Sequence, residues 1–402
     1  MRRDPATCLP DADKVQGEFV SADGETWYRI QGYDRLAPFF VSLASDSDLW
    51  AFVSTAGSLT AGRRDERGAF LPYETVDRIH ERAAHTGPRC WIRVPGAQGA
   101  ELWQPFVQQA LPAPVQRSVW KNLSGTRLRF RELNPGLGLA FETEWFSAAT
   151  LGLVRTSRLW RSGTPGAGSP PVRVQVLDGL LNLQPPGLDP RIAATMSSLA
   201  DAYKWNEAAA GGRMGLFTLY AQIWDRAEPK ESFQALVAWH AGTPSGASIV
   251  LSAQQVQRFC LQGQVDGETL TRGRRGAFLV RFEAEVPASG LEWHVVVDGP
   301  CSQVQAFELA KRLESGGDPS ARILQAREAN TRGVDELLAR ADGFQHSGDL
   351  MAAVHHRANV LFNIMRGGVF VDGTTLDRDD LGRFVQQRHR RIGAQLAGSL
   401  AA

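Results

Sequence analysis

The sequence predicts a mainly β protein, a large antiparallel β-sandwich followed by a helical C-terminal segment. Short strand-like stretches recur between residues 17 and 298. All 11 Trp lie between Trp27 and Trp293, and all 5 Tyr between Tyr28 and Tyr220; after Trp293, Ala, Leu, Arg, Asp and Glu dominate. Aromatic and β-branched residues favour sheets, whereas Ala, Leu, Arg and Glu favour helices. We therefore predict a β-sandwich domain over residues 1–299 and a helical segment over residues 300–402.

The predicted strands are short and are separated by turn signals such as the Asn-Pro-Gly of residues 134–136. In Arg127-Leu-Arg129-Phe-Arg131 the charged and apolar residues alternate, which predicts a strand with one buried face. Many short strands with few helices between them favour an antiparallel sandwich over a parallel α/β sheet. Helical interruptions are expected at 190–206 and 253–261. The expected strands cover residues 18–21, 27–31, 38–43, 49–54, 90–94, 127–132, 137–145, 152–161, 172–181, 215–223, 235–240, 277–286 and 292–298.

The period of the apolar residues changes after residue 300. Apolar side chains at helical spacing predict helices over 304–313, 323–341, 350–365 and 376–396. Asp318-Pro319 is an N-cap residue followed by proline, a strong helix-start signal, and Gly367-Gly368 ends the third helix. These helices resemble a connector that packs on a further domain.

Composition and charge exclude several function classes. Lys and Arg total 44 and Asp and Glu 43, a net charge of +1, so neither nucleic acid nor a membrane surface is expected as a partner. No apolar run has the length of a membrane span, and no apolar segment follows the basic start, so we expect a cytoplasmic protein. The four cysteines are scattered, which predicts buried free thiols. The nucleotide, zinc-peptidase and serine-hydrolase motifs are absent, and no cofactor is expected.

The densest polar segment covers residues 45–77. Its small residues Gly57 and Gly62 allow close approach of a ligand, and Arg63 offers a planar donor fork. Trp50 and Tyr73 supply flat apolar faces that stack on sugar rings, and nearby carboxylates bind sugar hydroxyls or act as an acid/base pair. The alternative is a solvated, turn-rich hairpin with structural salt bridges. The two carboxylates of Asp46-Ser47-Asp48 lack further ligands, so no metal site is predicted.

Five segments resemble the amino-terminal region of large carbohydrate-active proteins related to cellobiose phosphorylase. They are SDSDLWAFVSTAGSLTAGRRDERGAFLPYETVDRIHE (45–81), ELNPGLGLAFETEWFSAATLGLVRTSRLW (132–160), VLDGLLNLQPPG (176–187), SSLADAYKWNE (197–207) and ANVLFNIMRGGVF (358–370). The resemblance implies a β-supersandwich of the galactose-mutarotase type, joined by linker helices to an (α/α)6 barrel that holds the catalytic carboxyl group. The sandwich contributes a loop to the rim of the sugar site, and the resemblance implies that residues 57–63 form this loop. The implied ligand-binding residues are Asp48, Trp50, Gly57, Thr60, Gly62, Arg63 and Tyr73.

The resemblance favours a non-catalytic carbohydrate-recognition module, because the chain stops at Ala402, about where the barrel should begin. Its ligand would be an oligosaccharide or glycoside, and no catalytic residue is assigned. The first alternative is a glycoside hydrolase or phosphorylase in its own right, with carboxylates drawn from Asp46, Asp48, Glu74 or Asp77. The second alternative is an interaction protein that docks a separately encoded catalytic (α/α)6 barrel in trans.

Overall fold

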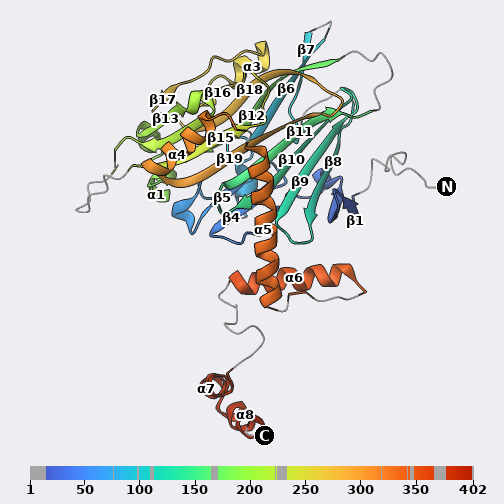
Figure 1. Cartoon of the computed structure of the whole chain (residues 1–402), viewed down its shortest axis with the longest axis vertical. Coiled ribbons are helices and arrows are strands. Elements are labelled where there is room, and N and C mark those ends of the chain that lie inside the picture. The colour runs from blue at the N-terminus through green and yellow to red at the C-terminus, as the bar shows by residue number, and fades with distance from the viewer. Residues whose placement is uncertain are drawn as a thin grey trace, which may run out of the picture. The chain divides into compact units, whose positions relative to one another are not determined.

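The protein is mainly β, with large antiparallel sheets and a helical C-terminal segment, which confirms the predicted fold class (Figure 1). The computed structural model describes residues 15–75, 77–96, 99–108, 113–163, 171–221, 223, 233–317, 319–341, 343–344, 348–365 and 377–400. The chain forms two compact units, Met1–Thr331 and Arg332–Ala402. The division predicted after residue 299 stays a prediction.

The largest sheet has eleven strands in the order β1-β2-β8-β9-β10-β11-β19-β15-β14-β13-β17, and neighbouring strands are antiparallel. Every expected strand that falls on this sheet overlaps an observed one. The expected helix over 190–206 is too long, because residues 204–206 pair within the sheet as part of β13. The strands are β1 (Gln16–Ala22), β2 (Glu25–Gln31), β8 (Gln116–Asn122), β9 (Arg127–Asn134), β10 (Leu139–Ala148), β11 (Gly152–Arg161), β13 (Lys204–Ala209), β14 (Met214–Leu219), β15 (Gln234–Ala241), β17 (Leu270–Arg272) and β19 (Leu291–Ser302).

Two smaller antiparallel sheets pack against this large one. A five-stranded sheet has the order β16-β18-β12-β6-β7, and a three-stranded sheet has the order β3-β4-β5. The strands are β3 (Phe40–Leu43), β4 (Leu49–Ser54), β5 (Leu59–Arg63), β6 (Gly87–Gly96), β7 (Gly99–Trp103), β12 (Val172–Leu183), β16 (Ser248–Val250) and β18 (Gly276–Val286).

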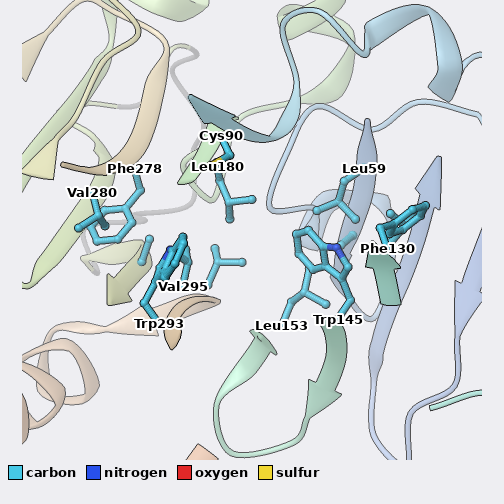
Figure 2. Close-up of a cluster of buried hydrophobic side chains, with 14 of the residues drawn as sticks. Leu59, Cys90, Phe130, Trp145, Leu153, Leu180, Phe278, Val280, Trp293 and Val295 are labelled. Carbon is cyan, nitrogen blue, oxygen red and sulfur yellow. The ribbon is translucent and has the colours of Figure 1, made fainter. Parts of the chain in front are cut away.

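The core lies between the large sheet and the two smaller ones (Figure 2). Figure 2 shows Trp145 and Trp293 of the large sheet among aliphatic and aromatic side chains of the opposing strands, including Leu59, Leu180 and Phe278. These side chains are almost fully buried. Burial of apolar area at about 25 cal/mol per Å² makes this layer the main source of stability for the sandwich.

Helices cover parts of the outer faces of the eleven-stranded and five-stranded sheets. Ala306 and Leu313 of α4 and Ile323 of α5 pack on Trp239 and Val296 of the large sheet. Phe259 of α3 packs on the outside of the five-stranded sheet. Shorter 3-10 turns occupy Tyr33–Arg35, Glu66–Gly68, Ile79–Arg82 and Ala210–Gly212. The helices of this unit are α1 (Pro190–Thr195), α2 (Ser197–Ala202), α3 (Val256–Gln262), α4 (Gln303–Glu314) and α5 (Ser320–Arg340), which continues into the second unit.

The second unit contains the end of α5 together with α6 (Leu350–Met365), α7 (Arg378–Arg388) and α8 (Arg390–Leu400). Arg357 of α6 forms an ion pair with Asp335 and lies over the ring of Phe344. The single helix expected over 376–396 is wrong. The chain breaks at His389, whose backbone is extended; in a continuous helix Arg388 and Arg391 would be neighbours of like charge, which is unfavourable at that spacing. The stop signal at Gly367-Gly368 and the cap residue Asp318 fall outside the described residues.

The alternating arginines of residues 127–131 predict a polar, solvent-exposed outer face on the large sheet. In the structure, other side chains cover this face. Arg129 is 1% exposed and lies over the ring of Trp27, with its guanidinium carbon 4.4 Å from the ring centroid. Arg131 lies between Trp120 and Trp160. The alternation itself is confirmed, but tryptophans and carboxylates from neighbouring strands cover the charged face. Cation–π contact of this kind is stronger where both groups lose water.

Within the described residues, Cys90, Cys260 and Cys301 are free thiols, and Cys8 falls outside them. Burial raises the pKa of Cys90 and Cys301, that of Cys301 to about 11. These thiols are therefore protonated and poorly reactive at neutral pH. In the part of the chain that the structure describes, no helix is both long and apolar enough to cross a membrane.

Candidate functional site

An open cleft of about 870 Å³ lies where the three-stranded sheet meets the end of the large sheet. Its walls come from the turn after β5 (residues 64–70), the β10–β11 turn (149–150), the segment 186–190, the end of β19 (298–301) and side chains of α4 and α5. Segments from distant parts of the sequence therefore form one site. A volume of this size suits a ligand larger than a single small ion.

Arg63 holds one wall of the cleft together. Strand alternation places it on the same face of β5 as Leu59 and Ala61, which face the large sheet. Its Nε donates to Asp298 Oδ1 at 2.7 Å, Nη1 to Asp48 Oδ1 at 2.6 Å, and Nη2 to the Ala149 carbonyl at 2.9 Å. Burial alone would lower the pKa of Arg63, but its hydrogen bonds and ion pairs with Asp298 and Asp48 raise it, so the guanidinium stays charged.

Asp48 and Arg63 are the two predicted site residues that the structure places on this cleft. Arg63 directs most of its donors to the chain itself, so its role is to fix the two carboxylates in place. Asp48 also faces Arg64 at 3.6 Å, and its side chain remains 39% exposed. The wall thus presents two oriented carboxylates, of Asp48 and Asp298, around one guanidinium.

The segment expected as a loop over 57–63 is wrong in part, because residues 59–63 form the buried strand β5, paired with β4. Thr60 is buried, and its Oγ1 has no hydrogen-bond partner within the described residues. Gly57 has a positive φ of 96° and borders a separate cavity of only about 40 Å³. Neither residue lines the large cleft.

Gly62 allows the close backbone packing that forms one wall of the cleft. A Cβ at this position would lie 2.5 Å from the Gly68 carbonyl oxygen, 2.7 Å from Ala69 Cα and 2.8 Å from the Trp50 ring. Glycine is therefore required for the turn of residues 64–70 to fold back onto β5, where Gly62 also bridges to Ala69.

Replacing Gly62 by alanine is expected to destabilise the protein by about 1–3 kcal/mol, because two of the three close neighbours are backbone atoms that move only with the turn. Chemical denaturation measures this change. Gly163→Ala is the matched control, since a Cβ at Gly163 meets no atom within 4 Å. Equal midpoints for Gly62→Ala and wild type would show that the turn shifts freely.

Trp50 and Tyr73 belong to a separate aromatic row on the outer face of the three-stranded sheet. Ring centroids are 5.8 Å apart for Phe40 and Phe52, 6.3 Å for Phe52 and Trp50, and 5.9 Å for Trp50 and Tyr73. Tyr73 at the end of the row is 45% exposed. The structure therefore divides the predicted site: Asp48 and Arg63 face the cleft, and the aromatic residues form another surface.

The candidate catalytic carboxylates are held by other groups. Asp48 is paired with Arg63, and Glu74 accepts from Arg82 Nε at 2.7 Å. A hydrogen bond from Thr75 lowers the pKa of the fully exposed Asp77. Glycoside hydrolysis needs two carboxyl groups placed about the scissile bond, whereas Asp48 and Glu74 each form an ion pair with an arginine of the chain. Among the described residues, no group of three or more His, Cys, Asp or Glu side chains is placed to hold a metal ion.

Sequence patterns miss several cleft residues. Asp298 is separated from Arg63 by 235 positions, and it is marked only by its place after a run of buried valines. Arg312 and Arg322 also line the cleft, from α4 and from the first turn of α5. They look like ordinary polar-face residues of amphipathic helices, so only the folded arrangement shows that they share a site with Asp48.

Comparison with solved structures finds partial likeness to carbohydrate-active enzymes. A bacterial glucoamylase complexed with acarbose has a TM-score of 0.38 at 8% identity, over 81% of this chain and 42% of that one. A family GH92 inverting mannosidase from Bacteroides thetaiotaomicron has a TM-score of 0.27 at 11% identity, over 78% and 32%. A 4-alpha-glucanotransferase from Thermococcus litoralis has a TM-score of 0.26 at 10% identity, over 71% and 40%.

The chain thus spans less than half of the length of each of these three proteins. No protein-family model matches the sequence, and no curated protein matches it. The TM-scores and sequence identities of the three solved structures assign no activity to this chain.

Proposed function

We propose that the chain is a non-catalytic carbohydrate-recognition module, similar to the amino-terminal part of a glycoside hydrolase or phosphorylase, with an oligosaccharide or glycoside as its ligand. The observation that supports this most is the 870 Å³ cleft, whose wall presents the carboxylates of Asp48 and Asp298 fixed around Arg63. Sugar hydroxyls donate to carboxylates and accept from guanidinium groups, so such a wall suits a polyhydroxylated ligand.

A non-catalytic role is favoured over glycoside hydrolysis by the same contacts. Hydrolysis needs one carboxyl group that holds a proton and a second that acts as base or nucleophile. In the cleft, Asp48 and Asp298 both accept from the one guanidinium of Arg63, so both carboxylates are held in a contact of the chain itself. The pair is therefore suited to accepting hydrogen bonds from the hydroxyl groups of a ligand.

Filling the cleft tests the proposal. Thr150 is an exposed residue of the β10–β11 turn that lines the cleft, so Thr150→Trp places a large ring in the ligand volume. We expect the dissociation constant for a saccharide found by glycan-array screening to rise at least about tenfold, a loss of about 1.4 kcal/mol. Calorimetric titration measures the constant, and the melting temperature should not change.

The control is Ser289→Trp, which adds the same ring to the exposed β18–β19 turn away from the cleft. Tyr73→Ala tests whether the saccharide binds at the aromatic row instead, because Tyr73 belongs to that row and does not line the cleft. A loss of binding in Tyr73→Ala alone would move the site to that row. Absence of binding to every saccharide on the array would contradict the proposed function.

A further inference from the structure

Two arginines that line the cleft come from neighbouring helices. Arg312, in the last turn of α4, and Arg322, in the first turn of α5, both line the cleft and are largely exposed to it. Among the described residues, neither forms an ion pair or a side-chain hydrogen bond with the chain. Two cationic forks therefore face the cleft without an anionic partner among the residues that the structure describes.

The acidic groups of the cleft are already engaged elsewhere. Asp48 and Asp298 bind Arg63, as described above. Asp65 accepts the backbone N–H of Arg67, and Asp189 accepts the backbone N–H of Arg191, so each caps a short helix. None of these four carboxylates, all in the described part of the chain, forms an ion pair or a hydrogen bond with Arg312 or Arg322.

The placement of Arg322 is electrostatically unfavourable in the free protein. It occupies the first turn of a 21-residue helix, where the helix dipole disfavours a cation. Burial and the nearby charge of Arg312 both lower its pKa. An oxyanion bound between the two guanidinium groups would remove the repulsion and use the bidentate geometry that arginine offers to carboxylates and sulfates.

We propose that Arg312 and Arg322 bind the oxyanion of an acidic saccharide in this cleft, while Asp48 and Asp298 accept hydroxyl groups of the same ligand. This inference rests on the proposed function and narrows its substrate class. The anion is the carboxylate of a uronic acid or a sulfate ester, since each can offer two oxygen atoms to the two parallel N–H donors of a guanidinium group. A neutral saccharide would leave the repulsion between Arg312 and Arg322 in place.

The test compares three probes by calorimetric titration into the full chain: maltoheptaose, which is neutral, an oligogalacturonate, which carries carboxylates, and a heparin-derived hexasaccharide, which carries sulfate esters. We expect one acidic probe to bind at least about tenfold more tightly than maltoheptaose, because a charge-assisted pair contributes about that factor. Its affinity should fall as salt rises. The stronger of the two acidic probes identifies the anion.

The variants assign the effect to the two side chains. Arg312→Ala/Arg322→Ala should weaken the acidic probe at least about tenfold and leave maltoheptaose unchanged, and the single variant Arg322→Gln should give part of this loss. Lys311→Ala is the control, because it removes the same charge from the same helix outside the cleft lining. All four proteins should melt at similar temperatures, since these side chains are exposed.

Three results would overturn the inference. Equal affinity for neutral and acidic probes, or an equal loss in Lys311→Ala, would show that Arg312 and Arg322 do not select the ligand. Binding of maltoheptaose alone would overturn the inference and leave the proposed function standing. No binding of any saccharide, here and on the array, would contradict both.

Discussion

Asp178→Ala is expected to lower the free energy of unfolding by about 3–5 kcal/mol, because it leaves a buried guanidinium without its counter-charge. Asp178 of β12 is fully buried and forms an ion pair with Arg155 of β11, which is 1% exposed. The same carboxylate accepts from Trp293 Nε1 at 2.6 Å. This group therefore joins the five-stranded sheet to the large sheet in the middle of the apolar core.

Urea denaturation followed by tryptophan fluorescence measures the loss, and Asp266→Ala is the control. Asp266 is also paired with an arginine, Arg258, but its side chain is 77% exposed. A surface pair contributes about 0–1 kcal/mol. Similar losses in the two variants would show that burial does not set the contribution of the pair.

The double variant Arg155→Met/Asp178→Leu separates the cost of an unpaired charge from the contribution of the pair. Replacing a buried pair by apolar side chains of similar volume is often neutral or stabilising. We therefore expect the double variant to recover most of the stability that Asp178→Ala loses. A double variant as unstable as the single one would mean that the Arg155 hydrogen bond to the Gly179 carbonyl is essential to the sandwich.

The sequence predicts strands well where side-chain alternation or aromatic residues are strong. The expected strands at 49–54 and 152–161 match β4 and β11 to the residue. β5 is missed because its sequence, LTAGR, has small residues with weak strand preference, and only pairing with β4 defines it. β16 and β17 have three residues each, too few for a periodic pattern.

In the candidate site too, residues that are close in sequence could be predicted, and residues that only the fold brings together could not. Asp48 and Arg63 lie 15 positions apart within one polar segment, so sequence reasoning finds both. Asp298, Arg312 and Arg322 join them through pairing of sheets and packing of α4, and no local pattern contains that arrangement. Trp50 and Tyr73 were expected with Arg63, but strand alternation sends Trp50 to the opposite face of the three-stranded sheet.

Glu144 is expected to be the second residue whose replacement has a large effect. It is 3% exposed on β10 and forms ion pairs with Arg127 at 2.9 Å, Arg129 at 2.7 Å and Arg327 of α5 at 3.4 Å. Glu144→Gln removes the charge that balances these three guanidinium groups and keeps the shape of the side chain. We expect a loss of about 3–5 kcal/mol at pH 7, together with looser docking of α5 onto the sheet.

The same contacts predict a specific acid dependence. Burial alone would raise the pKa of Glu144, but Arg127 and Arg129 lower it to about 2. Because the folded pKa lies below the unfolded value of about 4.5, the stabilisation is fully present above that value and is lost as pH falls from about 4.5 toward 2. Its size is about 3 kcal/mol, at about 1.4 kcal/mol for each pH unit of the shift.

Denaturation midpoints measured between pH 7 and pH 2.5 test whether protonation of Glu144 causes the loss of stability in acid. Wild-type stability should fall below pH 4.5, and Glu144→Gln should give a flatter profile, because the group that takes up the proton is gone. Glu283→Gln is the control, since Glu283 pairs with the 67% exposed Arg173 on the sandwich surface and should change the stability by less than about 1 kcal/mol. If Glu144→Gln kept the wild-type slope, the acid sensitivity would come from other groups, and the assignment to Glu144 would be wrong.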